Sequence, residues 1–157
     1  MKKYLILYYS HGGHTENFAN ELAKLIDADL MKIKPQKPYD YEYKDLVNVV
    51  LKEDKEKYCP EIKNDIEKID NYDTIFLGSP TWCGTFAAPI RTVLKNINLT
   101  DKVIIPFGTN GGGGFGKTIT DYKTEFENIN LLKGYSKKPK DEEELLNSWL
   151  KEISIIK

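Results

Sequence analysis

Three short segments of this chain combine residue types that bind ligands, and the first runs from Ser10 to Thr15 with the sequence SHGGHT. It follows the apolar run Tyr4–Tyr9 and precedes a helical pattern that begins at Glu16. A strand, a loop rich in glycine and hydroxyl groups, and a helix N-terminus form an anion site, because backbone N–H groups converge there and the helix dipole adds positive charge. The loop has no lysine or arginine, so we expect it to hold one phosphate group through neutral donors.

Both histidines of the chain, His11 and His14, lie in this loop. A metal pair would need a third ligand, and the sequence offers none nearby, so we predict no metal site. Imidazole titrates near the pH at which a phosphate monoester loses its second proton. We therefore expect the two histidines to make phosphate binding pH-dependent.

The second segment, Gly78–Thr85 (GSPTWCGT), follows another apolar run. Proline and two glycines favour a rigid turn, and Trp82 could stack on a flat ring, burying roughly 150–250 Å². The alternative is that Trp82 packs over a helix end. Cys83 has no histidine or aspartate beside it in sequence, so we expect a small neutral residue rather than a nucleophile.

The third segment, Gly111–Thr118 (GGGGFGKT), fits the Walker A pattern G-x-x-x-x-G-K-T. A P-loop NTPase also needs an acidic residue at the end of a later strand, and none follows Thr118 in that context. A dinucleotide site needs an acid after the next strand, and Lys133 and Gly134 occupy that place. We expect instead a loop, Gly108–Gly112, whose backbone amides approach a ligand edge closely because side chains are absent.

The elements that must position these loops alternate between strand and helix patterns. Such alternation predicts an α/β fold with a parallel sheet covered by helices on both faces. In these sheets ligands bind at the carboxyl ends of the strands, so the three loops should face one crevice. The predicted strands are Tyr4–Tyr9, Leu30–Ile33, Tyr72–Leu77, Lys102–Phe107 and Ile129–Leu132; the predicted helices are Glu16–Asp27, Asp45–Lys57, Glu61–Ile69, Pro89–Asn96, Lys117–Asn128 and Asp141–Ile153.

Composition excludes several classes of function. The 157 residues predict a single domain over residues 1–157, and 23 basic against 24 acidic residues leave a formal charge of −1. Without a basic excess we expect no nucleic-acid partner, and no segment approaches the ~20 apolar residues that span a membrane. Two cysteines are too few for a disulfide scaffold, which indicates a reduced, cytoplasmic location.

The chain resembles the short-chain flavodoxins and the flavodoxin-like FMN reductases over nearly its whole length. The resemblance rests on Tyr9–Thr15 as a phosphate loop, on Gly78–Trp82 as a first loop beside the flavin, and on Pro106–Gly113 as a second. The absence of a long insertion around the fifth strand is typical of the short-chain form. The resemblance implies a three-layer, doubly wound fold with a five-stranded parallel sheet in the order 2-1-3-4-5.

The same resemblance implies FMN as the cofactor. Hydroxyl groups of Ser10 and Thr15 would bind the phosphate, Trp82 would stack on one face of the flavin, and amides of the two later loops would meet its polar edge. Gly12 stands where a hydroxyl residue is usual and His14 where asparagine is usual. No tyrosine covers the second flavin face; Phe115 could replace it, or that face is open. The implied cofactor-binding residues are Ser10, His11, Gly12, Gly13, His14, Thr15, Pro80, Thr81, Trp82, Cys83, Gly84, Thr109, Asn110, Gly111, Gly112 and Phe115.

Two functions are considered at this point, and a flavodoxin-like fold that binds no flavin is a third possibility. The first is a flavodoxin that carries electrons between redox partner proteins; the alternative is an FMN-dependent NAD(P)H:quinone-type oxidoreductase acting on small quinone-like acceptors. Carrier flavodoxins are commonly very acidic, which a charge of −1 does not match. Against the enzyme, Arg91 is the only arginine, and no basic cluster in sequence suggests a clamp for the NADPH phosphate. We favour the carrier, as a monomer or weak dimer.

Overall fold

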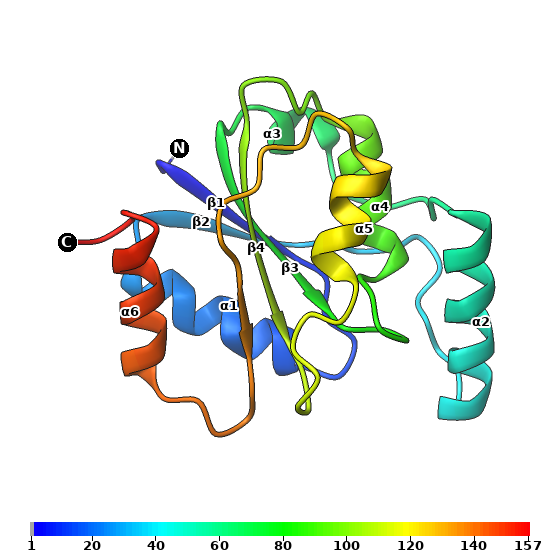
Figure 1. Cartoon of the computed structure of the whole chain (residues 1–157). Coiled ribbons are helices and arrows are strands. Elements are labelled where there is room, and N and C mark those ends of the chain that lie inside the picture. Colours follow the sequence, from blue (N-terminus) through cyan, green and yellow to red (C-terminus); the bar gives the residue numbers. More distant parts are fainter. Residues whose placement is uncertain (1) are drawn as a thin grey trace.

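Five parallel strands form a central sheet in the order β2-β1-β3-β4-β5, as predicted (Figure 1). The computed structural model describes residues 2–157. The strands are β1 (Tyr4–Tyr8), β2 (Ala28–Lys32), β3 (Thr74–Pro80), β4 (Val103–Thr109) and β5 (Tyr135–Lys137); the helices are α1 (His14–Leu25), α2 (Tyr43–Glu56), α3 (Ile66–Asp70), α4 (Ala88–Asn96), α5 (Thr118–Glu125) and α6 (Glu143–Glu152).

The central strands are buried on both faces, which explains their continuous apolar sequences. All five residues of β1 are buried, and alternate side chains enter opposite cores. Leu5 and Leu7 join the core beneath α3, α4 and α5, whereas Ile6 joins the core beneath α1 and α6. The sheet therefore lies between two helical layers, which confirms the doubly wound, three-layer fold (Figure 1).

The fifth strand lies further along the chain than the predicted segment Ile129–Leu132. Leu131 makes only an isolated bridge to Ile104, and β5 begins at Tyr135. The pairing of β4 with this part of the chain is interrupted between Leu131 and Tyr135. Pro106 explains the interruption, because it is the next residue of β4 on the side that faces β5 and has no N–H to donate. Gly134 passes this point closely: a Cβ on it would stand 2.4 Å from the Pro106 carbonyl oxygen.

The predicted helix Glu61–Ile69 is also wrong in its first half, since α3 begins only at Ile66. The preceding residues are extended and pair with the segment that follows β2, through an antiparallel bridge between Pro35 and Ile62. This pairing joins residues far apart in the sequence, so a local helical pattern could not reveal it. The residues between these paired segments form a long connection that includes α2. This helix lies beside α4 and away from the sheet (Figure 1).

Candidate binding site at the carboxyl ends of the strands

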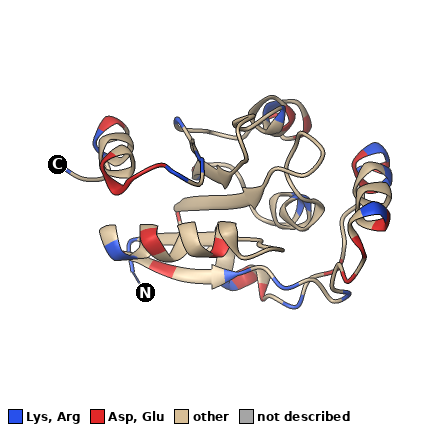
Figure 2. Ribbon diagram, turned by 90° about the horizontal axis from the view of Figure 1, so that it is seen from below, with Lys and Arg blue, Asp and Glu red and all other residues tan. Residues whose placement is uncertain are grey.

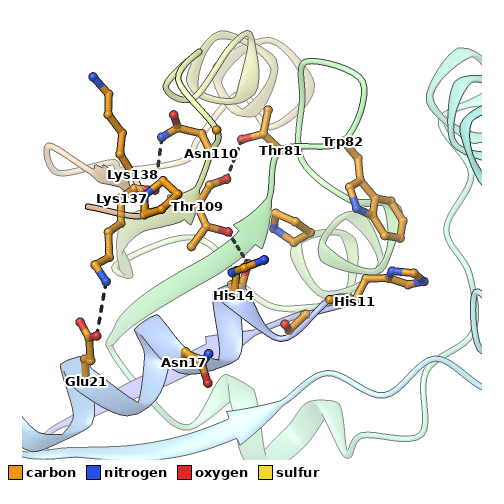
Figure 3. A pocket seen from close by; sticks show the side chains of 16 residues that line it. His11, His14, Asn17, Glu21, Thr81, Trp82, Thr109, Asn110, Lys137 and Lys138 are labelled. Atoms are coloured by element: carbon orange, nitrogen blue, oxygen red, sulfur yellow. Dashed lines mark hydrogen bonds and ion pairs between the residues drawn. The ribbon is translucent and has the colours of Figure 1, made fainter. Parts of the chain in front are cut away.

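The loops after β1, β3 and β4 converge on one cavity of about 650 Å³, as predicted from the sheet topology (Figure 3). This volume is in the usual range for small-molecule sites. The predicted residues that line it are Ser10, His11, Gly12, His14, Thr15, Pro80, Thr81, Trp82, Thr109, Asn110 and Gly111.

The first loop ends in a tight helix start. Gly13 has a φ of 92°, a left-handed conformation that favours glycine, and α1 begins directly after it, at His14. The Glu16 N–H donates to the Ser10 hydroxyl oxygen at 3.2 Å. Because that hydroxyl accepts from the helix, its own proton remains free for an anion. The first turn of α1 also has N–H groups without helical acceptors, at the wall of the cavity.

Thr15 links the first loop to the loop after β4. Its side chain is buried, and its hydroxyl oxygen lies 2.9 Å from that of Thr109. Either hydroxyl can donate in this pair. When Thr109 donates, the Thr15 proton is available to a ligand. The hydrogen bond therefore fixes two walls of the cavity relative to each other.

Trp82 is held by three other rings rather than by a helix end. Its ring centre lies 5.4 Å from that of Tyr9, 5.1 Å from Tyr39 and 5.6 Å from His11, each in an edge-to-face arrangement. His11 is itself fixed, with Nε2 2.8 Å from the Tyr39 carbonyl oxygen. Edge-to-face pairs of aromatic rings stabilise a structure by more than the burial of their surface alone. These contacts therefore hold the indole in place before any ligand binds.

The aromatic cluster extends to a half-buried carboxyl group, that of Glu53. The Tyr39 hydroxyl donates to Glu53 at 2.7 Å. Burial raises the pKa of Glu53, although the hydrogen bond from Tyr39 and the charge of Arg91 oppose this. Burial and, secondarily, the Glu53 charge raise the pKa of Tyr9 far above its ordinary value. Tyr9 and Tyr39 are therefore neutral phenols over the physiological pH range.

Residues 82–85 form a closed two-residue turn. Trp82 and Thr85 exchange backbone hydrogen bonds of 2.7 and 3.1 Å, and both central residues are left-handed, with φ values of 49° for Cys83 and 85° for Gly84. This is the pattern of a type I′ turn. Burial, then the charge of Asp54, raises the pKa of the exposed Cys83 thiol. A raised pKa disfavours the thiolate, which is the nucleophilic form of the side chain.

The glycine-rich run after β4 docks on this turn. The Lys117 N–H donates to the Gly84 carbonyl oxygen at 2.6 Å, and a Cβ on Gly116 would stand 2.5 Å from that oxygen. Gly116 is thus required for a close approach between two loops. Neither Lys117 nor Thr118 lines the cavity, so the Walker-like sequence is not arranged here as a phosphate clamp.

Several predicted site residues lie outside the cavity lining. Phe115 is one: its half-buried ring lies next to the backbone of Gly108 and of Gly134. Its proposed position over a flavin face stays a prediction. The others are Gly13, Cys83, Gly84 and Gly112.

The cavity also has a basic wall that sequence reasoning missed. Lys137 and Lys138 come from the end of β5, and Lys137 Nζ lies 3.3 Å from a carboxylate oxygen of Glu21 on α1 (Figure 3). The segment was missed because the fifth strand was predicted too early in the chain. The expectation of a purely neutral anion site is therefore incomplete. The missed lining residues are Asn17, Glu21, Lys137, Lys138 and Pro139.

A five-stranded, doubly wound parallel sheet in the order 2-1-3-4-5 with a ligand cavity at this edge is typical of the flavodoxin-like class of α/β proteins. Residues 3–153 match the family profile described as Flavodoxin. The chain therefore belongs to the flavodoxin family.

Solved structures agree with this assignment. A protein from Bacteroides eggerthii, provisionally named a flavoprotein, is 29% identical with a TM-score of 0.85, over 99% of this chain and 100% of that chain. A flavoprotein from Lactobacillus acidophilus, crystallised in complex with FMN, is 26% identical with a TM-score of 0.79, over 95% of this chain and 99% of that one. Oxidised Flavodoxin 2 from Bacillus cereus, at 21% identity, a TM-score of 0.58 and 97% coverage of both chains, shares the fold.

Proposed function

We propose that this protein binds FMN in the cavity at the carboxyl ends of β1, β3 and β4 and carries electrons between redox partners. The observation that carries the proposal is the presence on one cavity of an anion-binding helix start and a fixed indole. One end of the cavity suits a phosphate group and another suits a flat aromatic ring. The relative from Lactobacillus acidophilus, whose crystal structure contains FMN, supports the same cofactor.

The residues present fit FMN in both charge and shape. Ser10 and Thr15 would donate hydroxyl protons to the phosphate, together with the first N–H groups of α1. Lys137 and Lys138 would add positive charge beside it. Trp82 would cover one face of the flavin ring, backed by Tyr39 and its neighbours.

The flavin would supply the electron transfer, and the protein would orient it and limit its contact with water. Trp82 would shield one face of the flavin from water. The turn that carries Trp82 is fixed by the reciprocal hydrogen bonds between Trp82 and Thr85. Asn110 maintains the opposite loop: its side-chain N–H donates to the Ser136 hydroxyl at 2.6 Å, and its oxygen accepts from Gly112 N–H at 2.7 Å. These contacts hold the walls in place without the cofactor.

A comparison of FMN with riboflavin, which lacks only the phosphate, tests the assignment of the phosphate end. We expect a yellow protein that releases FMN on denaturation, and an apoprotein that binds FMN more tightly than riboflavin. Thr15→Val should weaken FMN binding about tenfold, in line with loss of one hydrogen bond to a charged group, and leave riboflavin binding unchanged. Equal losses for both ligands would place the phosphate elsewhere.

The ring end has its own test. Trp82→Ala should weaken both FMN and riboflavin by about 10- to 100-fold, since it removes an aromatic contact surface shared by the two ligands. Trp82→Phe is the conservative control and should retain most of the affinity. Quenching of flavin fluorescence on titration measures all of these constants. Unchanged riboflavin affinity in the alanine variant would contradict stacking on Trp82.

A second candidate function is an FMN-dependent NAD(P)H:quinone-type oxidoreductase. It is favoured by the formal charge of −1, because a carrier that docks on partner proteins commonly has a strongly acidic surface. Rapid NAD(P)H oxidation that depends on a quinone would support the enzyme. Reduction by a reductase protein, with negligible NAD(P)H oxidation by the purified chain alone, would support the carrier.

A further inference from the structure

A second cavity, of about 550 Å³, adjoins the first and shares Ser10 and His11 with it. It opens beside the segment that follows β2. Its walls include three lysines, Lys32, Lys34 and Lys63, which the sequence places up to 31 positions apart. Figure 2 shows that basic and acidic residues are interspersed along the chain between β2 and α2. The sequence therefore contains a basic cluster that becomes visible only in the folded chain.

Backbone pairing brings these lysines together. The Lys63 N–H donates to the Lys34 carbonyl oxygen at 2.7 Å. Asn64 completes the connection, because its side chain accepts from the Lys34 N–H and donates to the Lys32 carbonyl oxygen, both at 2.8 Å. The lysine side chains take no part in this pairing. Their positions are thus determined by the fold, while their charges remain available.

The three ammonium groups differ in what surrounds them. Lys32 Nζ forms an ion pair with Glu16 at 3.0 Å. Within residues 2–157, no ion pair or side-chain hydrogen bond engages the ammonium groups of Lys34 and Lys63. Asp40 is the acidic side chain on the described wall of this cavity. The cavity therefore has an excess of positive charge.

We propose that this second cavity binds a small molecule that carries a phosphate group, held by Lys34 and Lys63. Lysine binds phosphate as a point charge, and the volume is typical of small-molecule sites. Pro35 and Tyr39 form an apolar wall beside the lysines, which suits the organic part of a nucleotide better than free phosphate. This site adjoins the cavity assigned to FMN, with which it shares Ser10 and His11, but Lys34 and Lys63 line only the second cavity, and the inference goes beyond the proposed function.

The test is an NMR titration of the ¹⁵N-labelled protein with ADP, adenosine or inorganic phosphate, with and without excess FMN. We expect ADP to shift the amides of residues 32–40 and Lys63 under both conditions. A tighter constant for ADP than for phosphate identifies an organic phosphate as the ligand; equal constants identify free phosphate. Adenosine should bind far more weakly than either. Because FMN binding is measured separately, its failure would leave the ADP result interpretable.

Charge variants sharpen the test. Lys34→Gln with Lys63→Gln should weaken ADP binding about tenfold or more, and Asp40→Asn should strengthen it about two- to threefold. Lys52→Gln with Lys68→Gln changes the net charge equally at exposed positions outside the cavity and should leave binding unchanged. Raising the salt concentration should weaken binding in the wild type.

Several results would overturn the proposal. They are no binding of ADP or phosphate, shifts confined to the loop Ser10–Thr15, equal affinity in the Lys34/Lys63 double variant and its control, or adenosine binding as tightly as ADP. Binding of an acidic protein in place of the small anions would likewise overturn it.

Discussion

Arg91 is almost completely buried, at 1% exposure, and it connects three helices. From α4, its guanidinium donates to both carboxylate oxygens of Glu125 on α5, at 2.8 and 3.0 Å. Nη2 also lies 3.6 Å from Asp54 on α2. The guanidinium lies 4.9 Å from the centre of the Phe86 ring, within cation–π range. Arg91 thus helps to attach α2, which lies away from the sheet.

Arg91→Met should lower the free energy of unfolding by about 3–5 kcal/mol, because the largely buried Glu125 carboxylate would lose both hydrogen bonds from Arg91 and keep only its ion pair with the exposed Lys57. Urea denaturation at neutral pH measures the change. Lys133→Met is the control: it breaks the exposed pair between Lys133 and Glu152 and should cost less than about 1 kcal/mol. Equal costs for the two variants would contradict a structural role for the buried pair.

The same pair makes stability depend on pH. Burial alone would raise the pKa of Glu125, but the hydrogen bonds and charges of Arg91 and Lys57 outweigh it, so that the pKa is lowered. A carboxyl group with a lowered pKa contributes stability above its unfolded pKa and loses it as the pH falls through its folded pKa. The difference in stability between wild type and Arg91→Met should therefore shrink on acidification, as measured by urea midpoints from pH 6 downward.

At the scale of elements, the contact between the Trp82–Thr85 turn and the glycine-rich loop determines the position of the indole. Gly116→Ala should displace this contact, since the residue has a φ of 57° and its Cβ would meet the Gly84 carbonyl. We expect a loss of about 1–3 kcal/mol in unfolding free energy and amide NMR shifts in the turn. Gly113→Ala has open space around its Cβ and should leave both unchanged.

The elements also show what sequence could and could not predict. β1, β3 and β4 were predictable because burial on both faces gives unbroken apolar runs. β5 was not, since its residues Tyr135–Lys137 are half-buried and mixed in type, and Pro106 interrupts its pairing with β4. Because β5 was misplaced, the basic wall formed by Lys137 and Lys138 was missed.

The residues of the candidate binding site also divide into those that the sequence could predict and those that it could not. The loops Ser10–Thr15, Pro80–Trp82 and Thr109–Gly111 were predictable, because the carboxyl ends of neighbouring parallel strands meet at one edge. The aromatic support of Trp82 by Tyr39 was not, since Tyr39 belongs to a segment with no regular pattern. The cluster of Lys34 and Lys63 depends on long-range backbone pairing, which leaves no local signal.

At the scale of the whole molecule, hydrogen-bonded aspartates determine the acid limit of stability. The Tyr72 hydroxyl lowers the pKa of Asp29, and the Asn98 N–H lowers that of Asp70. The Lys138 N–H, then Tyr135, lowers the pKa of Asp141. Each contribution is present above an unfolded pKa of about 3.9 and is lost as the pH falls through the folded value. The urea midpoint should therefore fall between about pH 5 and pH 3, and less steeply in Asp29→Asn.

Glu53 should lower the stability of the folded state as the pH rises, which is the opposite of the effect of the aspartates. Its pKa is raised, chiefly by burial, so the folded state loses stability as the pH rises from the unfolded value of about 4.3 through the folded one. Glu53→Gln retains an acceptor for the Tyr39 hydroxyl and removes the half-buried charge. Its stability relative to wild type should increase from pH 4 to pH 7. A constant difference across this range would contradict the raised pKa.

The pairing of the segments around Pro35 and Ile62 has a consequence for the evolution of chain length. The Gln36 N–H donates to the Glu61 carbonyl oxygen at 2.8 Å, so the intervening stretch starts and finishes at the same point. The two ends of this stretch are therefore held together by backbone hydrogen bonds. Residues can be added or deleted near Asp40–Glu42, at its exposed rim, without altering the register of any strand. Homologues are therefore expected to differ in length here while preserving the same sheet.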